Sequence, residues 1–233
     1  MDFHDRQVVV TGGTGALGTA IVGMLLEAGA MCYVPFVHQS EADRFPHRDN
    51  RRVTLLPNSE LSEESLVAHL FDSVPRLWAS IHLAGGFAAG PIAEASKRDL
   101  MQQIDKNFVT CFLCCREAVK AIRQAGGGGR IVNVAARPAL EWRTGAGMAA
   151  YAASKAAVAA FSVALAEEVA KDAILVNAVA PSILDTPANR QAMPEADHSR
   201  WPKVEEVAQT LLFLAGPENK VTRGAVVPVY GRS

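Results

Sequence analysis

Short apolar runs alternate with longer amphipathic segments along nearly the whole chain. Apolar runs bounded by turn residues predict strands, whereas apolar positions three and four residues apart predict helices. The predicted strands are Gln7–Val10, Met31–Val37, Val53–Leu56, Ala79–Ala84, Arg130–Ala135, Ile174–Val179 and Ala225–Val229. The predicted helices are Ala20–Ala28, a segment from about Ser62, Arg98–Gln124, a segment that carries Tyr151 and runs to about Lys171, and a segment that ends at Ala215. This alternation is typical of a parallel sheet covered by helices on both faces.

Two segments depart from the alternation. The loop Arg137–Gly147 is polar and contains Trp142, and the segment Pro181–Pro202 is long and lacks a clear period. Long irregular segments of compact domains are often binding loops, so Pro187–Trp201 is either a lid over a substrate or an ordered surface loop. The lid residues that could contact a substrate are Arg190, Met193 and Trp201. No repeat, charge block or linker is present, so we expect one domain over residues 1–233.

A glycine-rich turn, TGGTGALG at positions 11–18, separates the first predicted strand from the first predicted helix. A dinucleotide pyrophosphate needs glycines there, because its phosphates approach the backbone closely and face the free N–H groups of the helix N-terminus. A second glycine cluster follows the fourth strand, at the sheet edge where ligands of such folds bind. The alternative is a plain turn. The residues expected to bind nucleotide are Gly12, Thr14, Gly15, Ala16, Leu17, Gly18, Ala84, Gly85 and Gly86.

The end of the second strand is where an acidic residue selects NADH and an arginine accommodates the 2′-phosphate of NADPH. Here the strand ends in Pro-Phe-Val-His at positions 35–38, so neither residue is present and the choice stays open. The missing acid removes a repulsion toward a 2′-phosphate, which slightly favours NADPH. His38, Ser40 and Arg44 are candidates to bind that phosphate, or they are only solvated.

Tyr151 and Lys155 stand one helical turn apart in an alanine-rich run and therefore face the same side of a helix. A phenol titrates near 10, and a nearby ammonium favours the phenolate. Lowering that pKa by about 3 units needs about 4 kcal/mol of differential stabilisation, which one charge in a low-dielectric cleft and a cationic cofactor ring can supply. The pair then predicts a general acid that works near neutral pH. The alternative is an ordinary surface pair.

The composition and the net charge indicate which classes of partner to expect. The chain has 49% hydrophobic residues and a formal net charge of −1, which gives no electrostatic reason to expect nucleic acid or an anionic membrane, so the expected partner is a small molecule. The start of the sequence has no cationic segment leading into an apolar core, and no apolar run suggests a membrane span, so we expect a soluble cytoplasmic protein. The cysteines Cys32, Cys111, Cys114 and Cys115 predict buried thiols and no metal site.

In order and spacing, these motifs resemble the short-chain dehydrogenase/reductase family. The matching segments are Thr11–Gly18, Ala84-Gly85, Asn107, the Tyr151/Lys155 pair and Pro181–Thr186. The resemblance implies a Rossmann-like, doubly wound sheet of seven parallel strands in a single α/β domain. It also implies hydride transfer from NAD(P), with Tyr151 as proton donor, Lys155 on the nicotinamide ribose and Asn107 holding a water. Pro181 and Thr186 would contact the cofactor.

The resemblance also bears on assembly, because the family typically pairs the Arg98–Gln124 helix and the Tyr151 helix between subunits. The Tyr151 helix is rich in small side chains that allow close helix packing. We therefore expect a homodimer or a homotetramer.

Two positions depart from the family pattern. The serine usual after the fifth strand is replaced by Ala136, so Thr144 either substitutes for it or is a turn residue, and Ala16 stands where classical members place glycine. Within the family, the chain resembles the quinonoid dihydropteridine reductase branch, which also lacks that serine. The segments that carry this likeness are Gly12-Gly13, Gly15–Gly18, Ala84–Phe87, Gly147-Met148, Leu184–Pro187, Asn189-Arg190, Met193–Asp197 and Trp201. Asn107 and the missing acid after the second strand do not fit that branch.

The predicted function is therefore NAD(P)H-dependent hydride transfer to a small carbonyl or to a conjugated or quinonoid acceptor, with Tyr151 as proton donor. Quinonoid dihydropteridine reduction is the narrower alternative. A nucleotide-binding regulator without turnover is the alternative from another class, and the missing serine is its only support.

Overall fold

The computed structural model describes residues 1–233 and contains one sheet of seven parallel strands in the order β3-β2-β1-β4-β5-β6-β7. The strands are β1 (Gln7–Thr11), β2 (Met31–Pro35), β3 (Val53–Leu56), β4 (Leu77–His82), β5 (Gly129–Val134), β6 (Ile174–Pro181) and β7 (Val226–Val229). The strand order reverses between β1 and β4, where doubly wound folds bind their ligands. The predicted single-domain α/β fold with seven parallel strands is confirmed.

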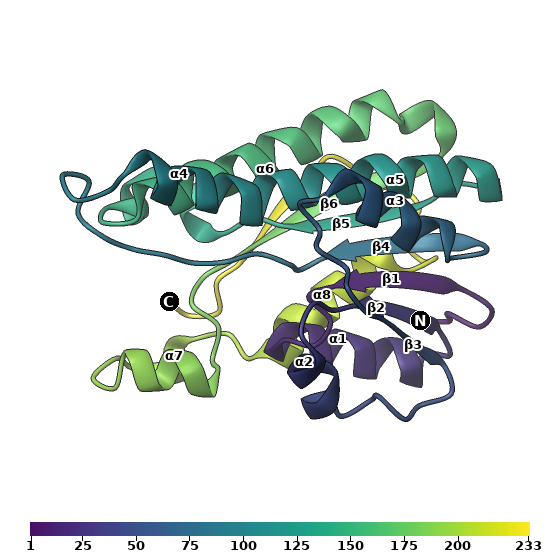
Figure 1. Cartoon of the computed structure of the whole chain (residues 1–233), viewed down its shortest axis with the longest axis horizontal. Helices are drawn as coiled ribbons and strands as arrows, with labels where there is room; N and C mark the ends of the chain where they lie inside the picture. Colours follow the sequence, from purple (N-terminus) through teal and green to yellow (C-terminus); the bar gives the residue numbers. More distant parts are fainter.

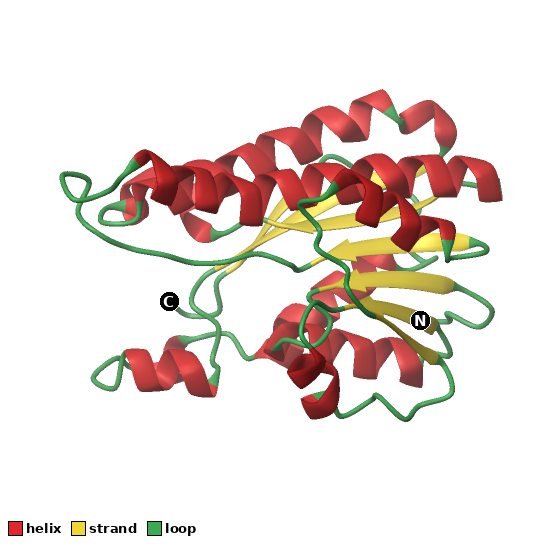
Figure 2. Cartoon of the chain, viewed as in Figure 1, coloured by secondary structure: helices red, strands yellow, loops and turns green.

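Helices cover both faces of the sheet (Figure 2). They are α1 (Ala16–Glu27), α2 (Gln39–Arg44), α3 (Glu64–Asp72), α4 (Lys97–Gln103), α5 (Thr110–Ala125), α6 (Ala149–Glu168), α7 (Pro187–Ala192) and α8 (Val204–Ala215). In Figure 1, α3, α4, α5 and α6 lie on one face, and α1 and α8 on the other. The loop between β4 and α4 and the short helix α7 both extend beyond the sheet at the end where the strands point (Figure 1).

Alternation along the strands divides the core into two clusters. Val9 of β1 packs with the residues of α3, α5 and α6, while its neighbours Val8 and Val10 pack with those of α1 and α8. Successive strand residues point to opposite faces, so a sheet buried on both sides is apolar at most positions along its strands. Each fully buried aliphatic side chain contributes about 1.5 to 3 kcal/mol relative to exposure, which explains why the strand pattern in the sequence is so clear.

The predicted helix Arg98–Gln124 is one continuous helical run with an irregular centre. A capping box of Ser96 and Asp99 begins α4, a π-helical segment at Ile104–Val109 follows, and α5 ends at Gly126 with φ 70°. Such π segments are rare and often lie at functional sites. The π segment contains Asn107, which is buried against the sheet side of the run.

Helix α6 corrects one expectation. Its 20 residues include a window with mean hydropathy 1.5, long and apolar enough to cross a membrane by length and composition. In the structure α6 packs along β6 and β5, and it buries Ser154, Lys155 and Ser162 on that side. The apolar composition of α6 therefore reflects a helix that covers a sheet.

The short helices α2 and α7 were not predicted. Helix α2 has six residues, QSEADR, which are too few and too polar to show an apolar period. Helix α7 lies inside the segment treated as irregular, begins with Pro187 and is capped by the Thr186 hydroxyl, which accepts from the backbone N–H of Asn189. Helix α1 begins at Ala16, earlier than predicted, so the last residues of the glycine turn belong to its first turn.

Candidate functional site

The glycine turn is closed by contacts that only glycine permits. A Cβ atom on Gly18 would lie 2.2 Å from the carbonyl oxygen of Gly12, and Gly12 itself has φ 65°. The turn packs against the end of β4, where the backbone N–H of Ala84 donates to the Thr11 hydroxyl at 3.3 Å. Gly15 is the N-cap of α1 and supplies no side-chain cap, so the first N–H groups of this helix are available to an anion. The turn has the features that a dinucleotide pyrophosphate requires.

Lys155 reaches the same end of the sheet from α6. Its ammonium donates to the carbonyl of Val134, at the end of β5, over 2.8 Å. A Cβ atom on Gly85 would lie 3.5 Å from Lys155 Nζ and 2.6 Å from Asn107 Oδ1, which shows how closely the loop after β4 approaches both side chains. Tyr151 lies one turn before Lys155 on α6, as the helical spacing predicts. The structure thus brings Gly85, Asn107 and Lys155 together near the end of β5.

Asn107 acts as a clamp between the loop after β4 and helix α6. Its amide oxygen accepts from the N–H of Gly86 at 3.0 Å, and its amide nitrogen donates to the Gly86 carbonyl at 2.9 Å and to Ser154 Oγ at 3.1 Å. The Ser154 hydroxyl in turn donates to the Tyr151 carbonyl at 2.7 Å. Asn107 therefore joins the loop after β4 to α6, and its expected role of holding a water stays a prediction. Ser154 belongs to this network and was not predicted.

The pKa of Tyr151 differs from the expectation. We expected the Lys155 ammonium to lower it, whereas burial raises the pKa of Tyr151 to about 12. The cause is desolvation, which disfavours the phenolate. Burial likewise lowers the pKa of Lys155 to about 8, and the neighbouring Cys111 opposes that shift. The phenol is consequently protonated over the neutral range, which is the form that a proton donor needs.

One aromatic side chain, that of Phe87, contacts the ring of Tyr151. The rings of Phe87 and Tyr151 are in edge contact, with centroids 5.0 Å apart and planes at 81°. Phe87 is 63% exposed, and Trp142, in the loop after β5, is 79% exposed. A cavity of about 270 Å³ is lined by the loop at 88–95, by α4 residues and by Met148, Ala149 and Ala150. This cavity borders the first turn of α6, which carries Tyr151.

The position of the absent serine is filled by Ala136, which is buried directly after β5. Thr144, the proposed substitute, lies in a 3₁₀ turn at Trp142–Gly145 and donates its hydroxyl to the carbonyl of Glu141 at 2.8 Å. This hydrogen bond is the one expected of a turn residue.

The predicted lid residues belong to the short helix α7 and the segment that follows it, and α7 extends beyond the ends of the strands (Figure 1). Arg190 of α7 forms a two-pronged ion pair with Asp185, with N–O distances of 2.6 and 2.9 Å. Met193 ends α7, and Trp201 is buried with its ring 4.6 Å from that of His198.

Thr186 caps α7, and Pro181 ends β6. No hydrogen bond joins Arg190, Met193 or Trp201 to Tyr151 or Lys155.

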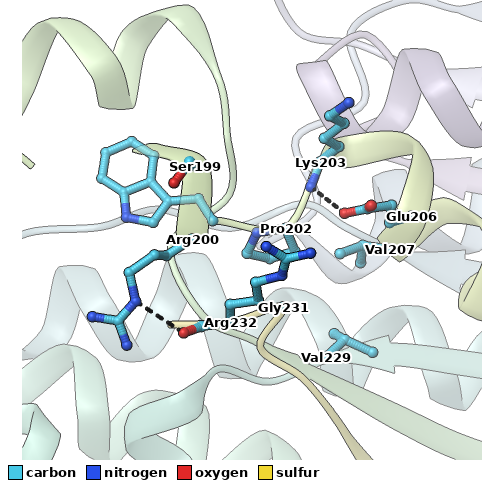
Figure 3. Close-up of a pocket in the computed structure, with 10 residues that line it drawn as sticks. Ser199, Arg200, Pro202, Lys203, Glu206, Val207, Val229, Gly231 and Arg232 are labelled. Carbon is cyan, nitrogen blue, oxygen red and sulfur yellow. Dashed lines mark hydrogen bonds between the residues drawn. The ribbon is translucent and has the colours of Figure 1, made fainter. Parts of the chain in front are cut away.

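The larger cavity of the chain, about 630 Å³, contains none of the catalytic candidates. Its lining includes Trp201 and residues of α8 and the C-terminal segment. The cationic side chains Arg200, Lys203 and Arg232 point in different directions there and do not converge on one anion (Figure 3). We therefore place the chemistry beside Tyr151.

A buried polar network beneath the site was not predicted. The ligand atoms of His82, Cys111 and Cys115 lie within 4.8 Å of one another. His82 also contacts Ser80 Oγ at 2.7 Å and Asn133 Oδ1 at 2.8 Å, so its ring nitrogens both have partners within the protein. The four cysteines are free and buried, as expected. The histidine was missed because it comes from β4, far from the cysteines in sequence.

A doubly wound parallel sheet, a glycine turn that opens helix α1, and a buried Tyr/Lys pair at the ends of the strands define a dinucleotide-dependent oxidoreductase. A family model described as short chain dehydrogenase matches residues 6–197. The chain belongs to this family and is an NAD(P)-dependent oxidoreductase of it.

Relatives resemble the chain over almost its whole length. The (2S)-[(R)-hydroxy(phenyl)methyl]succinyl-CoA dehydrogenase subunit BbsD of Thauera aromatica is 29% identical, and the match covers 99% of this chain and 97% of that protein. The 2,3-dihydroxy-2,3-dihydro-p-cumate dehydrogenase of Pseudomonas putida is 30% identical over 100% of this chain and 96% of that protein. The solved structure of ElxO with NADP bound has a TM-score of 0.87 at 22% identity and covers 97% of each chain, which supports the fold.

Proposed function

We propose that this chain transfers a hydride between NAD(P)H and a small carbonyl or a conjugated ring acceptor, and that Tyr151 supplies the accompanying proton. The observation that carries the proposal is the Tyr151/Lys155 pair on α6, with Lys155 held at 2.8 Å from the Val134 carbonyl. The glycine turn fits a dinucleotide because the close packing of Gly18 on the backbone of Gly12 and Gly13 leaves no room for a side chain, and the first N–H groups of α1 have no side-chain cap. When bound, NAD(P)H supplies the hydride.

The roles of the residues follow from their chemistry. Tyr151, protonated because its pKa is about 12, donates a proton to the acceptor heteroatom, and solvent returns it. The acceptor gains one hydride and one proton in total, so charge and electrons balance. Lys155 supplies a positive charge that stabilises the phenolate left behind. Asn107 is proposed to hold the loop after β4 in place, and Gly12, Thr14, Gly15, Ala16, Leu17, Gly18, Ala84, Gly85, Gly86, Pro181 and Thr186 are proposed to bind the cofactor.

The preferred acceptor is proposed to be a conjugated ring. In ketone reduction negative charge develops on oxygen, and loss of one donor that stabilises it costs about 3 to 4 kcal/mol. Ala136 offers no hydroxyl, and the Thr144 hydroxyl already donates to Glu141. A conjugated or quinonoid ring develops less localised oxyanion and needs mainly the proton of Tyr151. The exposed rings of Phe87 and Trp142 suit a flat, apolar acceptor. Quinonoid dihydropterin is the narrower candidate within this class.

The test is the oxidation of NADH and NADPH with quinonoid dihydropterin, quinones and a panel of ketones, on the wild type and Thr144→Val. We expect a ring acceptor to be turned over fastest and Thr144→Val to retain activity. If a simple ketone is fastest and Thr144→Val abolishes its reduction, the threonine replaces the serine and the ring proposal is wrong. If the protein binds NADH or NADPH but none of the acceptors supports oxidation of the bound nucleotide, the chain is the regulator considered as an alternative.

We propose that the chain assembles as a homodimer or homotetramer through the outer face of α5 and α6. The rings of Phe108, Phe112 and Phe161 form a cluster on this face, with centroids 5.4 to 6.3 Å apart. Phe112 is 42% exposed. An apolar patch of this kind is typical of an interface. Light scattering at micromolar concentration should give a dimer or a tetramer, and Phe112→Glu should dissociate it, whereas Val221→Glu in an exposed loop should not. A monomeric wild type would contradict the proposal.

A further inference from the structure

We infer that Glu41 is the residue by which this chain discriminates between NADH and NADPH; the inference rests on the dinucleotide site proposed above. Glu41 lies in α2, directly after β2. Its Oε2 accepts a hydrogen bond from the hydroxyl of Thr14 in the glycine turn over 3.3 Å. The side chain therefore bridges the turn after β1 and the segment after β2.

The hydrogen bond between Thr14 and Glu41 lies where Rossmann-like folds bind the adenosine ribose. In Rossmann-like folds the ribose of the adenosine half lies between the glycine turn and the end of the second strand, and an acidic side chain there binds the ribose 2′-hydroxyl. The strand end itself offers only Phe36, which is buried, and the apolar Val37. The backbone of Phe36 is fixed, because its N–H donates to Leu56 and its carbonyl accepts from Ser59. A carboxylate for the ribose must therefore come from another element.

Glu41 also keeps its negative charge free of a cationic partner. The chain's ion pairs do not include Glu41. The guanidinium groups of this segment are hydrogen-bonded to other partners. Arg44 donates to the Ser40 carbonyl, and Arg48 donates to the carbonyl of Asp43. A carboxylate in this position accepts from a ribose hydroxyl but repels a 2′-phosphate. The end of β2 has no carboxylate to repel the 2′-phosphate of NADPH, and Glu41 of α2 supplies one.

The experiment measures dissociation constants of NADH and NADPH by nucleotide fluorescence on the full chain, without any acceptor. The variants are Glu41→Gln, which keeps size and loses charge, and the matched control Asp43→Asn, which makes the same charge change on the same helix away from Thr14. We expect Glu41→Gln to lower the ratio Kd(NADPH)/Kd(NADH) by at least about tenfold. Asp43→Asn should change this ratio by less than about twofold, because its charge is exposed and screened.

The outcomes separate the two proposals. An unchanged ratio in Glu41→Gln, with both nucleotides still bound, overturns the role of Glu41 and leaves the dinucleotide site intact. An equal change in Asp43→Asn also overturns it, because the effect would then belong to the net charge of the helix. If the wild type binds neither nucleotide, the proposed function itself fails. Thermal melting of each variant checks that the fold is retained.

Discussion

The ring of Phe87 lies edge-on against the ring of Tyr151, with centroids 5.0 Å apart and ring planes at 81°. This contact joins the glycine loop after β4 to helix α6, and the clamp formed by Asn107 holds the same loop only one residue away, at Gly86. An aromatic pair of this geometry contributes about 0.5 to 1.5 kcal/mol beyond the area it buries. Phe87 therefore limits the motion of the phenol, while 63% of its own surface stays exposed.

The first prediction concerns Phe87. Phe87→Ala removes the edge contact and one wall of the site, so KM for a ring acceptor should rise at least about fivefold, while NADH affinity changes little. Steady-state kinetics and nucleotide titration measure the two quantities. Ile92→Ala is the comparison, because Ile92 is an exposed residue of the same loop that lines the cavity but makes no aromatic contact with Tyr151. An equal rise of KM in both variants would mean that the loop acts as a whole and that Phe87 has no separate role.

The second prediction concerns Tyr151. Tyr151→Phe keeps the ring and its contact with Phe87 but removes the proton, so kcat should fall at least about a hundredfold while nucleotide still binds. Single-turnover oxidation of bound NADH measures the chemical step. Near-normal turnover would remove Tyr151 from the role of acid.

Much of the site could be predicted because its signals are local. The glycine turn combines spacing with a strand before it and a helix after it, and the Tyr151/Lys155 pair depends only on helical geometry. Both lie where the sequence placed them. The structure adds that the Lys155 ammonium contacts Val134 at the end of β5, which helical spacing alone does not show.

What could not be predicted depends on contacts between distant segments. Glu41 comes from a helix too short to show a period, and His82 meets Cys115 only after β4 and α5 pack together. The pKa of Tyr151 was expected in the wrong direction because the spacing shows a nearby ammonium but not the extent of burial. Desolvation is a property of the packed site, and it is the cause of the raised pKa of Tyr151.

The third prediction concerns Gly18. A Cβ atom there would lie 2.2 Å from the Gly12 carbonyl oxygen and 2.5 Å from Gly13 Cα, so backbone must move. Gly18→Ala should lower NADH affinity at least about tenfold and the free energy of unfolding by about 1 to 3 kcal/mol. Calorimetric titration and urea unfolding provide the measurements. Gly90→Ala, where a Cβ atom meets nothing within 4 Å, should change neither quantity. Wild-type affinity in Gly18→Ala would show that the nucleotide does not use this turn.

The last prediction concerns Lys155, which is only 7% exposed and whose pKa burial lowers from 10.5 to about 8. Between these two values the unfolded chain holds a proton that the folded chain has lost, so the free energy of unfolding rises with pH from about 8 toward 10.5. Below about pH 8 the buried ammonium destabilises the fold by up to about 3 kcal/mol.

Nucleotide binding should change in the opposite direction, because a neutral Lys155 loses the positive charge that the site offers to the cofactor. NADH affinity should fall by about tenfold between pH 7 and pH 9, while stability against urea increases over the same range. In Lys155→Met both trends should be absent, since no proton is exchanged at this position. Titrations and unfolding curves at half-unit steps of pH, kept below pH 9.5 so that Tyr151 stays protonated, test both trends. If NADH affinity in the wild type is constant across this range, or if Lys155→Met shows the same profile, Lys155 does not control cofactor binding through its charge.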